Sequence, residues 1–222
     1  NLATRKKNMP LVAAFRAMEF FDRPDADRYA ELQKATASLD LWDTVRPMVL
    51  SWLETGLRPD ERPAVETPRR DSRKATPPFE AAHTPSWPLP PTGLRVPGEK
   101  GRGQIFPDTV TLIAIAIKEQ RNDDVLHWYA HAVKRGGGWQ RQLGETVAAA
   151  VQETHPDAAL GIWQSVARSH IAMTTAAAYQ MAGASLLKMK AVFQRTSRSA
   201  EWERLLAALR AEHARKPRMI DV

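Results

Sequence analysis

The chain has 222 residues, of which 43% are hydrophobic and 26% are charged, and its formal net charge is +7. This length and this hydrophobic content suffice for one or two domains with a buried core and exclude an intrinsically disordered chain. The absence of cysteine excludes disulfide bonds and thiolate metal sites, and no apolar run approaches the ~20 residues of a transmembrane helix. We therefore expect a soluble protein of the cytoplasm.

Three helices are predicted before residue 57. Asp25 is a typical N-cap for the second helix, and Asp40 and Gly56 mark the start and the end of the third. Pro47 lies inside this third helix, where a proline ring clashes with the carbonyl group four residues earlier. We therefore expect a kink or a break near Asp43.

The helical pattern disappears between residues 57 and 108. Most of the sixteen prolines fall in this stretch, together with the glycines between Gly98 and Gly103, so neither helices nor strands can run far. The glycines are not followed by Lys-Ser or Lys-Thr, which argues against a phosphate-binding loop. Phe79 and Trp87 are candidates for pinning the stretch to the helices, which would make it an ordered extended strap rather than a flexible tether.

Six further helices are predicted between residues 109 and 222, because apolar residues recur there at steps of three and four. Asp108 can cap the first of them, and Pro156 suits the start of the fourth. Short connections between helices of this length produce antiparallel hairpins, and one hairpin alone cannot bury both of its faces. Close helix packing is expected at the glycines inside these helices, Gly144, Gly161 and Gly183.

These patterns predict an all-α fold of stacked antiparallel helical hairpins, similar to a tetratricopeptide-like α-solenoid and interrupted by a proline-rich extended linker. The predicted domains are N-terminal helical hairpins at residues 1–56, the linker or strap at residues 57–108, and a C-terminal helical domain at residues 109–222.

No motif supports enzymatic chemistry. His127 and His131 have the spacing at which two imidazoles reach one metal, but no glutamate follows His127 as in the metalloprotease motif. The chain also lacks the Gly-x-Ser-x-Gly pattern of a hydrolase nucleophile, and the glycines at 136–138 follow a helix instead of a strand. We expect no catalytic activity, no metal site and no cofactor in this chain.

The C-terminal half carries a resemblance to a known family. The chain resembles the helical C-terminal region of bacterial SWIM zinc-finger proteins in residues 156–160, 178–179, 186–190, 201–202, 209–213 and 215–216. In that family, a tetratricopeptide-like array follows an N-terminal zinc finger. The resemblance covers residues 110–222 and, more loosely, residues 11–56.

This resemblance implies no zinc ligand in the present chain. The finger of the family requires a Cys-x-Cys pair followed by Cys-x-His, and the chain contains no cysteine. If the resemblance holds, the zinc module lies before Asn1 or has been lost.

The function expected from these features is that of a non-catalytic scaffold for protein-protein interaction. A groove between stacked hairpins would receive a partner, and arginines at its rim would favour acidic partners. The alternative is a nucleic-acid-associated accessory domain that uses the basic C-terminal helices, since basic residues outnumber acidic ones from Lys188 onwards. The candidate partner-binding residues are Trp87, Trp139, Arg204, Arg210, Arg215 and Lys216.

Overall fold

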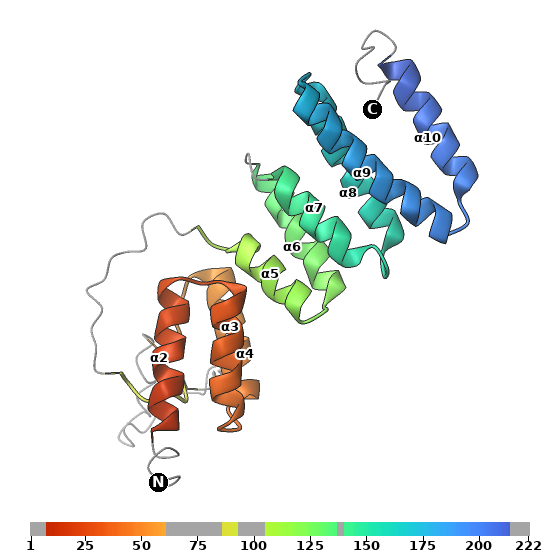
Figure 1. Ribbon diagram of the computed structural model, residues 1–222. Helices are drawn as coiled ribbons and strands as arrows, with labels where there is room; N and C mark the ends of the chain where they lie inside the picture. Colours follow the sequence, from red (N-terminus) through yellow and green to blue (C-terminus); the bar gives the residue numbers. More distant parts are fainter. Residues whose placement is uncertain (1–7, 61–85, 93–104, 137–139, 214–222) are drawn as a thin grey trace, which may run out of the picture. The chain divides into compact units, whose positions relative to one another are not determined.

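The computed structural model describes residues 8–60, 86–92, 105–136 and 140–213. For Gln140 it describes the backbone only. These residues form nine α-helices and no strand, which confirms the expected all-α class (Figure 1). The chain divides into two compact units, unit 1 at residues 1–115 and unit 2 at residues 116–222, and the division falls inside helix α5 (Thr109–Lys118). Among the described helices, none has both the length and the apolar composition required to span a bilayer.

Besides the first residues of α5, the described part of unit 1 contains three helices: α2 (Met9–Asp22), α3 (Ala26–Ala37) and α4 (Trp42–Thr55). Asp25 is the N-cap of α3, as expected, because its carboxylate accepts the backbone N–H groups of Asp27 and Arg28. Gly56 ends α4 with a φ of 78°, a left-handed conformation that suits glycine. The Phe106 ring lies only 2.7 Å from the position of a Cβ atom at residue 56, so a larger residue would also clash there.

Aromatic rings form the core of unit 1. The rings of Phe20 and Phe21 both meet Trp52 edge-on, at centroid distances of 5.7 and 4.8 Å. Tyr29 contacts Trp42 in the same way at 5.1 Å. Edge-to-face pairs of this kind add about 0.5–1.5 kcal/mol each to the stabilisation from burial of their apolar surface.

Two segments of the proline-rich stretch, residues 86–92 and 105–108, pack on this core without helix or strand structure. The ring of Trp87 lies 5.6 Å from that of Phe21, so Trp87 pins its segment to the helices as expected. Phe106 approaches Trp52 at 5.7 Å, and the backbone N–H of Asp108 donates to the carbonyl of Leu53 at 2.8 Å. Phe79 lies outside the described residues.

For α4, the expected cap at Asp40 and the expected break at Pro47 are wrong, whereas the alternative of a kink near Asp43 stays a prediction. Asp40 does not cap the helix, because it adopts a φ of 56° and the helix begins only at Trp42. Pro47 does not break α4, which continues to Thr55. Pro47 and Asp43 both lie on the exposed side of the helix, where water can bond the carbonyl group that the proline leaves without an N–H partner.

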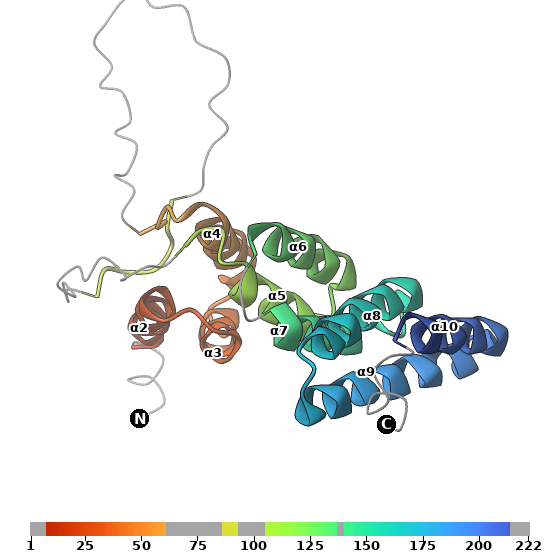
Figure 2. The same ribbon diagram turned by 90° about the horizontal axis from the view of Figure 1, so that it is seen from above.

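Besides the end of α5, unit 2 contains five helices: α6 (Asn122–Arg135), α7 (Gln140–Val151), α8 (Pro156–Ala172), α9 (Ala176–Arg195) and α10 (Ser199–Glu212). Figures 1 and 2 show them following one another along the unit. Each of them packs against the next in the chain. The apolar stripes predicted from the sequence face these contacts, as in the cluster of Ala167, Ile171, Tyr179 and Ala182 between α8 and α9.

Polar side chains connect helices that are two apart in the chain. Arg195 at the end of α9 contacts Glu153 after α7, and Arg198 before α10 contacts Asp157 in α8, both at 2.5 Å. Farther along, Arg168 of α8 lies 3.6 Å from Glu212 of α10. Because both contacts between α8 and α10 advance in the same sense along the two helices, these helices run parallel.

Four connections share one backbone feature. A non-glycine residue with a φ of 56–58° stands two positions before the next helix at Asp40, Gln120, Thr174 and Ser197. In three of these connections the following residue donates its N–H to a carbonyl five residues earlier, as Arg198 does to Phe193 at 2.8 Å. The same turn therefore recurs in both units.

The two glycines with described surroundings inside the helices of unit 2 differ. A Cβ atom at Gly144 would lie 2.9 Å from Val166 Cγ2 and 3.0 Å from the Tyr129 hydroxyl, so the expected close packing is confirmed there. At Gly161 such an atom would meet nothing within 4 Å, so the same expectation is wrong for this position. Helical periodicity marks both glycines but does not reveal which one faces a neighbour.

This difference predicts mutational effects of opposite sign. Gly144→Ala should lower the free energy of unfolding by about 1–2 kcal/mol, because the cost of overpacking exceeds the gain in helix propensity. Gly161→Ala should raise it by about 0.5–1 kcal/mol, because the propensity gain stands alone. Urea unfolding followed by circular dichroism measures both changes, and changes of the same sign would contradict the packing described here.

Candidate functional site

A half-buried polar cluster lies where three helices of unit 2 meet. Its centre is Glu145 of α7, whose side chain is 21% exposed. One carboxylate oxygen accepts the indole N–H of Trp163 in α8 at 3.2 Å and the ammonium group of Lys188 in α9 at 2.5 Å. The other oxygen accepts the hydroxyl of Ser185, also in α9. One carboxylate thus connects α7 with the two helices that follow it, α8 and α9.

Helical spacing explains this convergence. Ser185 and Lys188 are three residues apart in α9, so both side chains face α7. Glu145 contacts this pair, whereas Glu153, farther along the chain, contacts Arg195, so α7 and α9 run parallel. The residues one turn before Glu145 in α7 and one turn before Ser185 in α9 therefore lie at the same height along these two parallel helices.

The side chain of Arg141 is a basic group at this height. Arg141, one turn before Glu145, donates a hydrogen bond from Nη1 to the Ser169 hydroxyl of α8 at 3.3 Å. Within the described part of the chain, no carboxylate lies within ion-pair distance of Arg141, although its side chain is partly buried. The oxygens of Glu145, one turn away, already accept three other donors, so Glu145 has no hydrogen bond to Arg141.

The environment shifts two pKa values in the cluster. Burial alone would raise the pKa of Glu145, but hydrogen bonds from Lys188, Ser185 and Trp163 and the charge of Lys188 outweigh it, so this pKa lies below its ordinary value. Burial, and next the charge of Arg141, lower the pKa of His170, while Glu145 opposes this shift. At neutral pH, Glu145 is therefore an anion and His170 a neutral imidazole.

Two exposed methionines lie one helical turn from residues of this cluster, Met181 from Ser185 in α9 and Met173 from Ser169 at the end of α8. Met181, one turn before Ser185 in α9, is 53% exposed, and Met173 at the end of α8 is 48% exposed. Methionine side chains are flexible and polarizable, and they adapt to the shape of a bound partner. A cation beside adaptable apolar side chains is suited to bind a carboxylate that is carried by an apolar segment.

The cluster offers no basis for catalysis. Ser185 is only 1% exposed and its hydroxyl bonds the carboxylate, so it is not accessible as a nucleophile. Glu145 is held ionised by three donors, which makes it a weak base. The described residues contain no group of three or more ligands that could hold a metal ion.

The residues predicted from the sequence lie elsewhere. Trp87 is half-buried against Phe21 in unit 1, and Arg204 and Arg210 are exposed on α10. Arg204 donates from Nε to the carbonyl of Ala200 at 3.2 Å, and neither arginine belongs to the Glu145 cluster. The predicted residues Trp139, Arg215 and Lys216 lie outside the described residues.

The sequence analysis did not select Arg141, Glu145 or His170. Glu145 and Ser185 are 40 positions apart, and no local pattern indicates that they meet. The available signal was Glu145 itself, since a charged residue beside the apolar stripe of α7 requires a partner from a neighbouring helix.

The histidine pair on α6 has no third metal ligand beside it among the described residues. The rings of His127 and His131 lie 4.9 Å apart and both are exposed, as the spacing predicted. Trp128 approaches His127 edge-on at 4.8 Å. With two imidazoles and no third ligand among the described residues, the group is a surface aromatic cluster.

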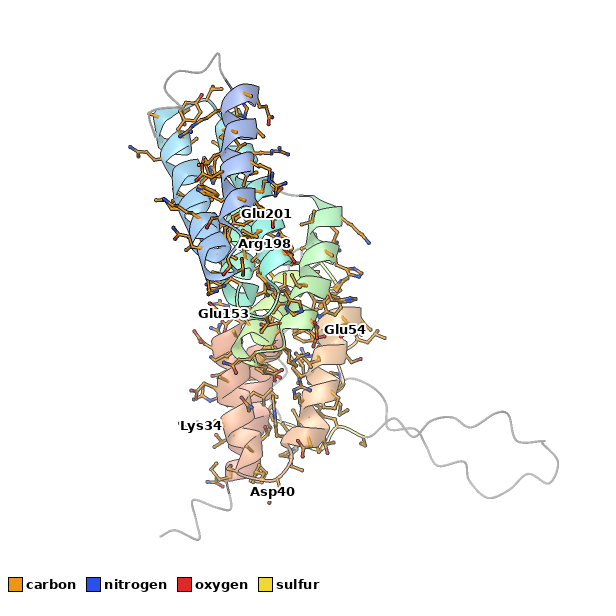
Figure 3. All side chains as sticks on the ribbon, turned by 90° about the vertical axis from the view of Figure 1, so that its right-hand side faces the viewer. Lys34, Asp40, Glu54, Glu153, Arg198 and Glu201 are labelled. Carbon is orange, nitrogen blue, oxygen red and sulfur yellow. The ribbon has the colours of Figure 1, made fainter. Side chains whose placement is uncertain are left out.

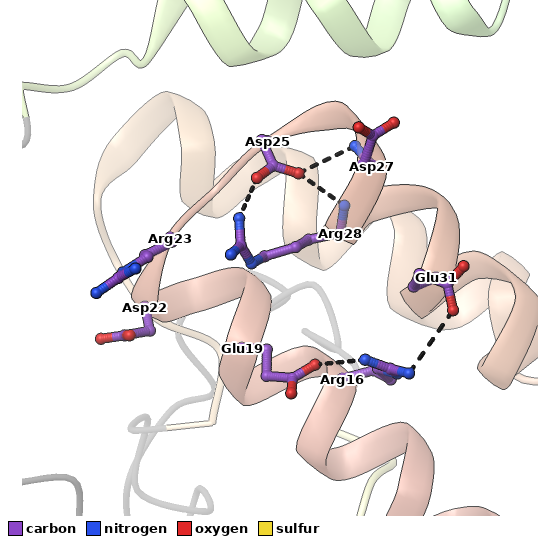
Figure 4. A pocket seen from close by; sticks show the side chains of 8 residues that line it. All are labelled: Arg16, Glu19, Asp22, Arg23, Asp25, Asp27, Arg28 and Glu31. Carbon is purple, nitrogen blue, oxygen red and sulfur yellow. Dashed lines mark hydrogen bonds and ion pairs between the residues drawn. The ribbon is translucent and has the colours of Figure 1, made fainter.

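Unit 1 has an open, charged depression of about 540 Å³ at the turn between α2 and α3 (Figure 4). Two of its three arginines pair with neighbouring carboxylates: Arg16 contacts Glu19 at 2.8 Å and Glu31 at 3.8 Å, and Arg28 contacts Asp25. Asp25 is also the N-cap of α3. These charges are explained by local structure, so the depression is a weaker candidate than the Glu145 cluster.

Comparison with family models, with curated proteins and with solved structures gives no match for this chain. The functional interpretation therefore depends on the geometry described above.

The hydrogen bonds of Glu145 predict a pH-dependent contribution to stability. At pH 7, Glu145→Gln should lower the free energy of unfolding by about 1.5–3 kcal/mol, as for hydrogen bonds to charged groups. Because the folded pKa lies below the value of 4.5 in an unfolded chain, acid protonates the unfolded state first. The contribution is therefore lost as the pH falls below about 4.5 and through the folded pKa, and the difference between wild type and variant should shrink.

The matched control is Glu153→Gln. The ion pair of Glu153 with Arg195 is exposed on both sides, at 67% and 41%, and should contribute at most about 1 kcal/mol. Denaturant unfolding at pH 7 and pH 4 measures both variants. Equal effects of the two substitutions would contradict the central role of Glu145.

Proposed function

We propose that the chain is a non-catalytic helical scaffold that binds an acidic segment of a partner protein on unit 2. In this proposal, unit 2 is a short tetratricopeptide-like stack of hairpins. Its support is the pattern of contacts, in which apolar side chains join successive helices and polar side chains join helices two apart. The recurring left-handed turn before α6, α9 and α10 agrees with repeated hairpin units.

The observation that carries the proposal is the partly buried Arg141, which has no carboxylate within ion-pair distance among the described residues, with exposed methionines one turn from Ser169 and Ser185. A guanidinium group that Ser169 already orients loses little conformational entropy when it binds a carboxylate. Met173 and Met181 then provide the apolar contact. Neutral His170 leaves Arg141 as the principal cation at this level of the cluster.

The resemblance to SWIM zinc-finger proteins is compatible with this role. We propose that the chain corresponds to the helical region that follows the zinc finger in that family, and that zinc binding belongs to the finger and not to this chain. A cytoplasmic location accords with the composition, since the chain has no cysteine.

Nucleic-acid binding is the less favoured alternative. Lys188 and Arg195 each contact a glutamate, and Arg198 contacts Asp157 as well as Glu201 at 2.7 Å (Figure 3). Basic side chains that are already paired with carboxylates release fewer counterions from a phosphate backbone. These pairs weaken the basic character that α9 and α10 show in the sequence.

A peptide-display selection on the full chain tests the partner-binding proposal. Selected peptides should be rich in Asp and Glu flanked by apolar residues, and their affinity should fall with rising ionic strength. Arg141→Glu should weaken binding of a selected peptide at least about tenfold, which corresponds to about 1.4 kcal/mol. The matched control Arg204→Glu should change it little. Loss of binding in the control alone would place the partner on α10 instead.

A fluorescence titration with mixed-sequence DNA and RNA tests the alternative. We expect no micromolar affinity at physiological salt. An affinity in that range, with a steep decrease as salt rises, would instead support the nucleic-acid function, because phosphate contacts make the binding constant salt-dependent.

A further inference from the structure

The segment Ser86 to Thr92, with the sequence Ser-Trp-Pro-Leu-Pro-Pro-Thr, lies on the helices of unit 1 without helix or strand structure and bends at Leu89. The aromatic ring of Trp87 in this segment contacts the ring of Phe21 in α2. Leu89 is only 5% exposed, and the hydroxyl of Thr92 lies 3.7 Å from the sulfur of Met18 in α2. Trp87, Leu89 and Thr92 thus serve as the anchors of the segment.

The segment is held without backbone hydrogen bonds. None of its backbone groups bonds to another residue in the described part of the chain. Its three prolines have no N–H to donate, and they favour the extended polyproline conformation before the segment docks. Side-chain contact alone therefore holds it, in contrast to the helices around it.

The surface beneath the segment has the chemistry of a peptide-binding site. The Phe21 ring also contacts Trp52, and the guanidinium carbon of Arg58 lies 4.9 Å above its centroid. Aromatic surfaces with a nearby polar group bind extended proline-rich peptides, because such peptides lose little conformational entropy on binding.

We propose that this surface of unit 1, centred on Phe21, is a recognition site for proline-rich segments of the Trp-Pro-Leu-Pro-Pro type. Residues 86–92 are its tethered occupant, and a segment of the same chemistry from a partner protein displaces them. Elements with few backbone hydrogen bonds open locally at low cost, which gives the partner access. This site is independent of the acidic-partner site on unit 2.

The test uses the full chain and a fluorescent peptide with the sequence of residues 86–92. Trp87→Ala combined with Leu89→Ala weakens the resident segment. The double variant should bind the peptide at least about tenfold more tightly than wild type, because a tethered occupant competes at a millimolar effective concentration. A control peptide with alanine at both anchor positions should bind neither protein.

Three results would overturn the proposal. A folded double variant, with unchanged helical circular dichroism, that does not bind the peptide would show that the surface is not a recognition site. An unfolded double variant would show that residues 86–92 are part of the core. A concentration-dependent wild-type dimer that the double substitution abolishes would identify a second copy as the occupant, and not a different protein.

Discussion

The carboxylate of Glu145 fixes the relative positions of three helices, and the proposed partner surface of unit 2 depends on it. Trp163, Ser185 and Lys188 reach it from the two helices that follow α7. A charge in such a partly buried place is tolerated only when it is fully hydrogen-bonded. Among the described residues, Arg141 then has no carboxylate within ion-pair distance. The interaction that connects these helices thus adjoins the arginine to which we propose that a partner binds.

The two units achieve order by different means. In unit 1, edge-to-face aromatic contacts around Trp52 hold the helices and the two segments that pack against them. In unit 2, aliphatic contacts between successive helices are supplemented by ion pairs between alternate ones. Aromatic surfaces adapt to extended peptides, whereas ion-paired helices present fixed side chains. The two proposed sites differ in the same way.

Local rules predicted most of the helices, whereas the candidate site required tertiary contacts. The cap at Asp25 and the stop at Gly56 follow from their own backbone requirements and are confirmed. Asp40 failed as a cap because it occupies the left-handed turn position, which equally favours Asp. Glu145 and Ser185 come together only through the packing of α7, α8 and α9. Helical periodicity contains no information on which residues of different helices come into contact. The same limit explains why Gly144 and Gly161 were expected to behave alike.

The bend shared by Asp40, Gln120, Thr174 and Ser197 has a consequence for how such a chain can change over time. When consecutive helices are joined by connections of the same backbone geometry, duplication or deletion of one connection with its helices leaves the other connections unchanged. Thr174 adopts this left-handed conformation although its β-branched side chain disfavours it. The geometry of the connection therefore outweighs the conformational preference of threonine. Helices could therefore be added to such a chain during evolution through the same type of connection.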